Sequence, residues 1–186
     1  MKLSVVIPAH NEEGCIDGTI SSLVTTLVAE KIPHEIVVVN DNSTDGTQAL
    51  LDKLCARFPT VRYVNNTPPN GFGFAVRRGL DEFEGDCVAI YMADASDLPD
   101  DLVRYYREMI AKNVDCVFGT RWSDGGKVVD YPLPKMVLNR LANTFIQTLF
   151  VTSYNDMTNA FKLFRREVIE GLQPIVREIG ESGGYT

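Results

Sequence analysis

The sequence predicts an α/β domain with a mostly parallel sheet and helices on both faces. Short apolar runs typical of buried strands alternate five times with segments that carry apolar residues at helical spacing. The chain has 186 residues, 45% of them hydrophobic, which suffices for one domain with a sizeable core. No apolar run approaches the roughly 20 residues that a membrane helix needs.

The first half of the chain supplies three of the expected strands. Residues 3–7 form a strand that Pro8 ends, and a helix over residues 11–30 follows with apolar side chains at helical spacing. A Val-rich strand at 35–39 leads into a polar loop and a helix that ends near residue 57. The third strand is expected at 61–64.

The second half of the chain continues the alternation of strands and helices up to residue 118, after which the alternation ends. A helix at 71–83 precedes a strand at 87–92, and a helix at 98–112 with Pro99 in its first turn precedes a strand at 115–118. A loop rich in Gly and Pro follows. The remaining elements are expected at residues 135–150 (helix), 160–164 (strand) and 166–172 (helix), with no packing signal in the tail at 180–186.

Charge and cysteine content narrow the function classes. The formal net charge is -7, which argues against nucleic-acid binding through a basic surface. The four cysteines form no close pairs, so neither a zinc ligand set nor a disulfide framework is visible and a reducing cytoplasm is expected. The apolar start of the chain is too short for a signal peptide.

Acidic side chains cluster after the fourth strand. Asp94 and Asp97 fall just past its carboxyl end, which is where open α/β sheets bind ligands. Carboxylates there suit a hard divalent cation, and such a cation suits a phosphorylated substrate. Asp97 could instead cap the next helix, while Asp100 and Asp101 complement its dipole. Asp94 lies too far upstream to cap.

Two polar loops follow the first and second strands. Asn11 could cap the first helix, which is the simpler interpretation, or its loop could receive a nucleoside together with Glu12. Asp41 could serve helix capping or accept a base N–H or ribose hydroxyl, as acidic residues do in dinucleotide folds. Two facing loops of this kind favour the nucleoside interpretation.

Two further segments carry cations. Residues 70–79 contain spaced glycines but lack the Lys-Ser/Thr end of a phosphate loop; Arg77 or Arg78 could reach a phosphate or lie in solvent. Near the end of the chain, Asp156 precedes Lys162, Arg165 and Arg166. These cations could be solvated, or could supply the positive field that a diphosphate leaving group needs.

Taken together, these segments resemble the family 2 glycosyltransferases of the GT-A fold, a Rossmann-like arrangement, and most closely the branch of dolichol-phosphate mannose synthases and polyprenyl-phosphate sugar synthases. The matching runs are VVIPAHNE, VVVNDNSTDGT, GFGFAVRRGL, GDCVAIYMADASDLPDDL, GTRW, NRLANTF and NDMTNAFKLFRREVIEGL. They span residues 5–172 in order. The resemblance implies one catalytic domain over residues 1–186, truncated at its C-terminus, because the family's domain usually continues.

The resemblance also implies a chemistry and a set of site residues. It implies a GDP- or UDP-sugar donor, a Mg²⁺ or Mn²⁺ ion and inversion at the anomeric carbon. The family holds its nucleoside at the positions of Pro8, Ala9, Asn11, Glu12 and Asp41. Asp94 falls on the second aspartate of the metal-binding DxD motif, Arg121 on the arginine of G-[ST]-R, and Asp156 where acceptor- and phosphate-handling groups lie.

The sequence departs from the family pattern at three positions. Met92 replaces the first DxD aspartate, so metal ligation rests on Asp94 with Asp97 or water helping. Lys162 replaces an arginine and keeps the charge without the bidentate fork. Asn40 replaces the first of two aspartates after the second strand.

The acceptor decides what the remaining groups do. A polyprenyl phosphate is already nucleophilic, so Asp156 need only position the metal or the acceptor, whereas a saccharide hydroxyl requires a base such as Asp156 or Asp97. Arg121 and Lys162 would stabilise leaving-group charge.

The alternative function is a catalytically weak nucleotide-sugar-binding module, which Met92 suggests. For the apolar residues of helix 135–150, core packing is the simpler interpretation and an interfacial helix beside a lipid acceptor at the cytoplasmic membrane face is the other.

Overall fold

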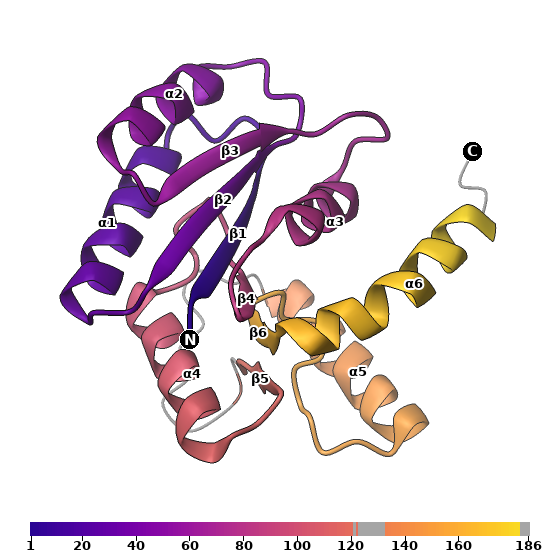
Figure 1. Ribbon diagram of the computed structural model, residues 1–186. Helices are drawn as coiled ribbons and strands as arrows, with labels where there is room; N and C mark the ends of the chain where they lie inside the picture. The colour runs from indigo at the N-terminus through magenta and orange to yellow at the C-terminus, as the bar shows by residue number, and fades with distance from the viewer. Residues whose placement is uncertain (121, 123–132, 183–186) are drawn as a thin grey trace.

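The computed structural model describes residues 1–120, 122 and 133–182, which form a six-stranded sheet flanked by helices (Figure 1). The strand order is β3-β2-β1-β4-β6-β5. The strands are β1 (Leu3–Ala9), β2 (His34–Asn40), β3 (Val61–Asn65), β4 (Cys87–Ile90), β5 (Cys116–Phe118) and β6 (Lys162–Arg165). The first four are mutually parallel, and β6 runs antiparallel between β4 and β5. The predicted mostly parallel sheet is confirmed.

Helices cover both faces of this sheet, as predicted. They are α1 (Ile16–Ala29), α2 (Thr47–Arg57), α3 (Phe72–Glu82), α4 (Pro99–Lys112), α5 (Leu133–Phe150) and α6 (Arg166–Ser182). Helices α1, α2 and α4 share one face, while α3 and α6 contribute to the hydrophobic cluster on the other (Figure 1). No helix in the described part of the chain has the length and apolarity needed to cross a bilayer.

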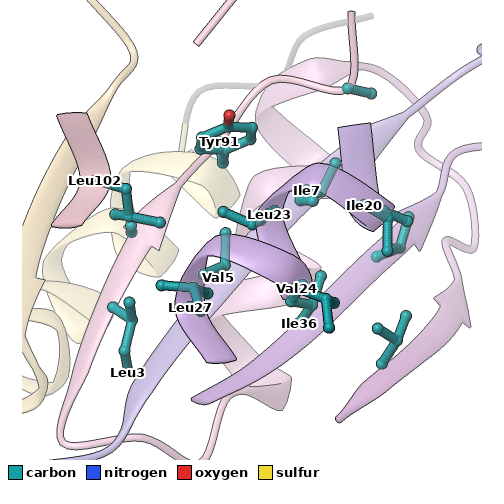
Figure 2. Packing of buried hydrophobic residues seen from close by; sticks show 14 of the residues in the cluster. Leu3, Val5, Ile7, Ile20, Leu23, Val24, Leu27, Ile36, Tyr91 and Leu102 are labelled. Carbon is teal, nitrogen blue, oxygen red and sulfur yellow. The ribbon is translucent and has the colours of Figure 1, made fainter. Parts of the chain in front are cut away.

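The central strand β1 builds both cores by alternation. Val5 and Ile7 point to the larger core, where Figure 2 shows them beside Leu23 and Leu27 of α1. Val6 points to the smaller core on the opposite face. Successive side chains of a strand face opposite sides of the sheet. Because both faces of β1 are buried, its sequence is a continuous apolar run and not an alternation of apolar and polar residues.

Helix α3 approaches the sheet closely at one glycine. A Cβ atom added at Gly79 would overlap Val6 of β1 and crowd Val39 of β2. Of the spaced glycines at the start of this helix, Gly73 has an open Cβ direction. Gly71 has a different constraint, because its φ of 124° is disfavoured for residues with a side chain.

Several element boundaries differ from the expected ones, among them those of β1, α1 and α6. β1 continues through Pro8 to Ala9. Its pairing with β4 ends at Val6, so Pro8, which has no N–H, interrupts no hydrogen bond to that strand. α1 begins at Ile16, five residues later than expected, since residues 11–15 form the loop described below. α6 continues to Ser182 through Pro174, which removes one helical hydrogen bond without ending the helix.

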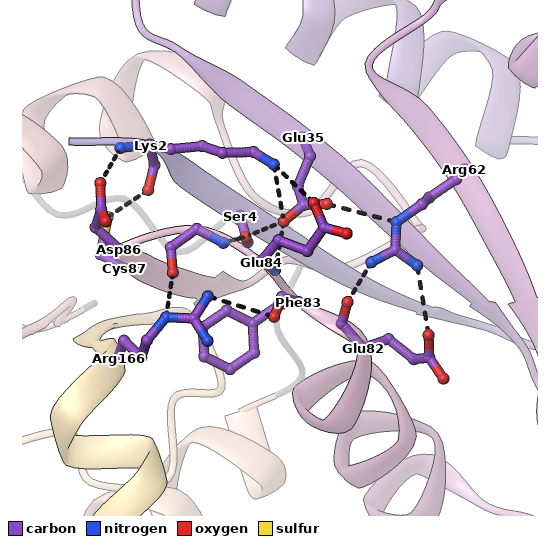
Figure 3. A network of polar contacts seen from close by, with 11 residues as sticks. Lys2, Ser4, Glu35, Arg62, Glu82, Phe83, Glu84, Asp86, Cys87 and Arg166 are labelled. Carbon is purple, nitrogen blue, oxygen red and sulfur yellow. Dashed lines mark hydrogen bonds and ion pairs between the residues drawn. The ribbon is translucent and has the colours of Figure 1, made fainter.

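The amino-terminal edge of the sheet is closed by a polar network around Glu35 (Figure 3). One Glu35 oxygen accepts hydrogen bonds from the Ser4 hydroxyl and the Glu84 N–H, both at 2.6 Å. Lys2 and Arg62 lie 3.6 and 3.4 Å from the carboxylate. Burial alone would raise the Glu35 pKa, but these hydrogen bonds and cations together lower it below its ordinary value of 4.5.

We expect Glu35→Gln to lower the free energy of unfolding at pH 7 by about 1–3 kcal/mol, because the buried negative charge that strengthens these hydrogen bonds and pairs with Lys2 and Arg62 is lost. Folding lowers the Glu35 pKa, so its contribution is complete above about pH 4.5 and disappears as the pH falls through the folded-state value. Urea denaturation across this range should show the difference shrinking in acid.

The matched control is Glu84→Gln, which changes an acid that also pairs with Lys2 but whose side chain is 70% exposed. We expect a change within about 0.5 kcal/mol. A Glu35→Gln deficit that stays undiminished well below pH 4.5 would contradict the role given to the Glu35 charge.

Candidate functional site

The loops after β1 and β2 interlock through side chain to backbone hydrogen bonds. The Asn11 side-chain oxygen accepts the Thr44 N–H at 2.8 Å, and the Asn11 N–H donates to the Ser43 hydroxyl at 3.1 Å. The Glu12 N–H donates to the Thr47 hydroxyl at 2.8 Å. The two loops therefore face each other, as predicted. Asn11 does not cap α1, whose N-cap is Cys15, but ties its loop to the next one.

Glu13 also connects these two loops, although nothing in the local sequence marks it as a site residue. Its carboxylate accepts the N–H of Gly46, the N-cap of α2, at 2.6 Å, so Glu13 caps a helix that begins 34 residues later. In return, Asp45 accepts the Glu13 N–H at 3.2 Å. An acidic residue next to its own expected helix gives no local signal that it caps another one.

Asp41 lies at the carboxyl end of β2 and is 5% exposed. One carboxylate oxygen accepts the Asn66 side-chain amide and the other accepts the Gly71 N–H, each at 2.7 Å. Its own N–H donates to the Ala9 carbonyl at 2.8 Å. Asp41 thus connects β1 to the start of α3, and Pro8 and Ala9, the other predicted nucleoside positions on β1, lie in the strand beside it.

The loop after β4, residues 91–98, is termed the Asp94 loop. Asp94 is exposed, and one of its oxygens accepts the Ser96 N–H at 3.0 Å. Asp97 turns inward, where its carboxylate accepts the Met92 N–H at 2.9 Å and its carbonyl accepts the Tyr91 hydroxyl at 2.6 Å. Asp97 therefore closes this loop instead of capping α4, whose N-cap is Leu98.

The carboxylates of this loop repel one another and a carboxylate of the loop after β1. Burial, reinforced by the neighbouring negative charges of Asp94 and Asp101, raises the Asp97 pKa to about 6. Burial and then the charge of Asp94 also raise the Glu12 pKa. The loops after β1 and β4 thus bring carboxylates close enough to repel each other, which a bound cation would relieve.

The described residues fit a metal ion shared with a substrate. Among them, no three Asp, Glu, His or Cys side chains converge as a metal-binding group. Mg²⁺ commonly takes only one or two protein carboxylates and completes its shell with water and substrate phosphates. Asp94 meets that requirement, and Glu12 adds negative charge nearby. Asp97 offers less, because it is half-buried and its carboxylate is already bonded to the Met92 N–H.

The antiparallel strand β6 separates the predicted cations. Lys162 pairs with Ile90 near the site, and its ammonium donates to the Met157 carbonyl at 3.0 Å. Arg165 pairs with Cys87 at the opposite edge of the sheet. The suggestion that Arg165 and Arg166 supply a field for a leaving group is wrong, because a strand advances about 3.3 Å per residue and carries them away from the site.

Both arginines instead bond to backbone carbonyls at the amino-terminal edge of the sheet. Arg165 donates to the Val114 carbonyl at 3.1 Å, and Arg166 donates to the Gly85 carbonyl at 2.9 Å. Of the other predicted cations, Arg77 is exposed on α3 with its guanidinium carbon 5.6 Å from the Phe74 ring centroid. Arg121 lies outside the described residues.

Asp156 lies in the loop between α5 and β6, residues 151–161, termed the Asp156 loop. It is 3% exposed and lines a cavity of about 130 Å³ together with Phe118, Thr120 and Tyr154. Burial and surrounding negative charges, Asp97 and Asp156 among them, raise the pKa of Tyr105 to about 12. The Phe161 ring of the Asp156 loop packs against Tyr105 and against Tyr91 of the Asp94 loop, with ring centroids 4.6 and 5.5 Å apart, so the two loops lie at the same edge of the sheet.

The apolar side of α5 is exposed, so the expectation that its hydrophobic residues pack in the core is wrong. The exposed members of this apolar face are Val137, Leu138, Leu141, Phe145, Leu149 and Phe150. The helix turns Asn139 and Asn143 inward instead, and both contact Thr158 of the Asp156 loop. Buried polar groups require hydrogen-bond partners, and this requirement decides which side of α5 faces the protein.

The fold and these motifs agree with a comparison to protein families, in which the glycosyl transferase family 2 model matches residues 4–172. The chain belongs to glycosyl transferase family 2. It is 30% identical over 194 residues to a dolichol-phosphate mannosyltransferase of Pyrococcus furiosus, covering 100% of this chain and 54% of that protein. It is 33% identical over 171 residues to a polyprenol monophosphomannose synthase of Mycolicibacterium smegmatis, covering 89% and 62%.

Solved structures support the GT-A fold. Glucosyl-3-phosphoglycerate synthase from Mycobacterium tuberculosis, in complex with UDP, superposes with a TM-score of 0.68 at 21% identity over 89% of this chain and 57% of that one. A complex of that synthase with Mn²⁺, UDP and phosphoglyceric acid gives 0.67 at 22% identity, covering 89% and 56%. S. aureus TarS gives 0.62 at 21% identity, covering 93% and 49%. This family 2 chain thus spans only about half the length of several of its relatives.

We expect Asp41→Ala to reduce the free energy of unfolding by about 2 kcal/mol, because the Gly71 N–H and the Asn66 amide both lose their acceptor. Asp41→Asn is the matched control. Its oxygen can still accept the Gly71 N–H and its amide can donate to a rotated Asn66, so a loss under about 1 kcal/mol is expected. Urea denaturation measures both. An alanine variant as stable as the asparagine variant would contradict this account.

Proposed function

We propose that the chain is the catalytic domain of an inverting, metal-dependent glycosyltransferase that uses a GDP- or UDP-sugar. The observation that supports this most is the meeting of three acidic loops at one edge of a family 2 fold: Asp41 after β2, Glu12 after β1 and Asp94 after β4. In this proposal the first two loops, with Pro8, Ala9 and Asn11, receive the nucleoside. Arg77 is the predicted phosphate contact on α3.

Asp94 would hold the Mg²⁺ or Mn²⁺ ion, which supplies Lewis-acid stabilisation of the leaving diphosphate when bound. Asp97 assists by fixing the backbone of the Asp94 loop and is a second predicted ligand. Lys162 and Arg121 are the predicted cations for the leaving group. Lys162 also holds the Asp156 loop through its bond to Met157.

The proposed acceptor is a polyprenyl phosphate at a membrane surface, and Asp156 positions it. Three findings support this choice. The apolar face of α5 is exposed, the Asp156 loop follows directly from α5, and the two relatives named above are called a dolichol-phosphate mannosyltransferase and a polyprenol monophosphomannose synthase. Because a phosphate oxyanion is already nucleophilic, this acceptor needs no strong base. A saccharide hydroxyl would require Asp156 or Asp97 as base.

We expect one GDP- or UDP-sugar in a thermal-shift panel to raise the Tm by about 5–10 °C when Mn²⁺ is present. A ligand at 100 times its Kd stabilises by about 2.7 kcal/mol, and each kcal/mol shifts a domain of this size by about 2–4 °C. Asp94→Asn should lose the Mn²⁺-dependent part of this shift. The panel includes donors without metal to isolate that part.

The matched control is Asp100→Asn, which removes the same charge from the exposed first turn of α4. We expect its Mn²⁺-dependent shift to equal that of the unchanged chain. If Asp94→Asn also retains the full Mn²⁺-dependent shift, Asp94 is not the metal ligand. Donor binding without any sugar transfer would favour the catalytically weak binding module.

The membrane-surface acceptor predicts that the chain floats with phosphatidylcholine vesicles in a density gradient. Leu141→Asn combined with Phe145→Asn should reduce partitioning by at least about tenfold, because each buried apolar side chain contributes roughly 1.5–3 kcal/mol. The control pair, Val28→Asn with Ile110→Asn, changes exposed apolar residues of α1 and α4 and should float normally. Absence of flotation by the unchanged chain would favour a saccharide acceptor.

A further inference from the structure

Two asparagines of α5 converge on one hydroxyl of the Asp156 loop. Asn139 and Asn143 are four residues apart, which places them on the same side of the helix. The Asn139 amide donates to the Thr158 hydroxyl oxygen at 2.9 Å, and the Asn143 amide donates to the same oxygen at 3.1 Å. Asn143 is 2% exposed, so its side of this cluster is shielded from solvent, whereas Thr158 and its bond to Asn139 lie at the surface.

The orientation of the Asn143 amide follows from its other contacts. Its side-chain oxygen accepts the Thr158 N–H at 3.3 Å, which leaves its nitrogen facing the Thr158 hydroxyl. The same nitrogen lies 3.0 Å from the Asn139 carbonyl and 3.0 Å from the Asn139 side-chain oxygen. Each of these contacts requires nitrogen at that position, because only the NH₂ group of an amide can donate.

These contacts decide where the Thr158 hydroxyl proton points. A hydroxyl has two acceptor lone pairs and one proton to donate. Both asparagine amides lie within donating distance of this oxygen, so the hydroxyl acts as an acceptor toward α5 and its proton is directed toward another acceptor. The Asp156 carboxylate provides it, with one oxygen 3.4 Å from the Thr158 hydroxyl. That distance is long, as contacts at catalytic carboxylates commonly are before substrate binds.

We propose that Asn139 and Asn143 are positioning residues for Asp156 and act through the hydroxyl of Thr158. This inference rests on the proposed function, in which Asp156 handles the acceptor. The Thr158 hydroxyl donates to one carboxylate oxygen of Asp156, which fixes the rotation of the carboxyl group and aims its second oxygen. The Asn159 N–H, which donates to the Asp156 carbonyl at 3.3 Å, fixes the backbone of the same residue.

The test compares Thr158→Val, Thr158→Ser and Asn143→Leu in the full chain. Transfer is measured from UDP-glucose and from GDP-mannose to a short polyprenyl phosphate with Mn²⁺. Valine matches threonine in shape without the hydroxyl, so kcat should fall about 10- to 100-fold while the donor KM stays within about twofold. Serine keeps the hydroxyl and should restore kcat to within about threefold.

Asn143→Leu should reproduce the kcat loss of Thr158→Val, and the double variant should be no worse than Thr158→Val alone, because both act on the same contact. The matched control is Thr25→Val, which removes a hydroxyl bonded within α1 at Ser21. Its kcat should be unchanged. Additive losses in the double variant, or equal losses in the valine and serine variants, would overturn the inference.

Two further measurements separate this inference from the proposed function. In the ligand-free chain, Asn143→Leu should speed hydrogen exchange of the Thr158 N–H by at least about tenfold, and unchanged exchange overturns the contact whatever the turnover. Full turnover by Asp156→Asn would overturn the acceptor role of Asp156. If Asp156→Asn is inactive while Thr158→Val and Asn143→Leu keep full kcat, only the positioning inference fails.

Discussion

The central place of β1, parallel to both of its neighbours, is the constraint on which the rest of the structure depends. Parallel strands end at the same edge of a sheet, so the loops after β1, β2 and β4 emerge together. The register is fixed by burial on both faces, because a slip of one residue would exchange Val5 and Ile7 with Val6 between two differently shaped cores. On the other face, Gly79 lets α3 pack closely against Val6 because it has no side chain.

The two edges of the sheet use polar side chains in different ways. At the amino-terminal edge, the Glu35 carboxylate is surrounded by donors and cations, and its lowered pKa reflects that. At the carboxyl edge, loops bond to loops through Asn11, Glu13 and Asp41, while Asp94 remains exposed. Loops that are bonded to one another around the exposed Asp94 carboxylate suit a site that must hold its shape before a ligand arrives.

Helix α5 reverses the usual arrangement of a surface helix. Asn139 and Asn143 face the protein while apolar residues such as Leu141 and Phe145 face outward, the opposite of an amphipathic helix that packs its apolar side on the core. One helix thus carries both an apolar outer face and the side chains that contact the Asp156 loop. Any surface that binds this outer face would lie next to the loop proposed to handle the acceptor.

The sequence by itself determined the α/β class, the order of the elements and the apolar strands, because periodicity and buried runs are local signals. The sequence also predicted that the acidic loops lie at one edge of the sheet, because parallel strands all end at the same edge. Only the tertiary structure decided that β6 runs antiparallel between β4 and β5, which leaves Lys162 at the site and carries Arg165 away. The roles of Glu13 and the inward side of α5 also depend on partners distant in sequence. No local pattern reports such partners, because hydrogen bonds between distant segments exist only once the sheet has set their positions.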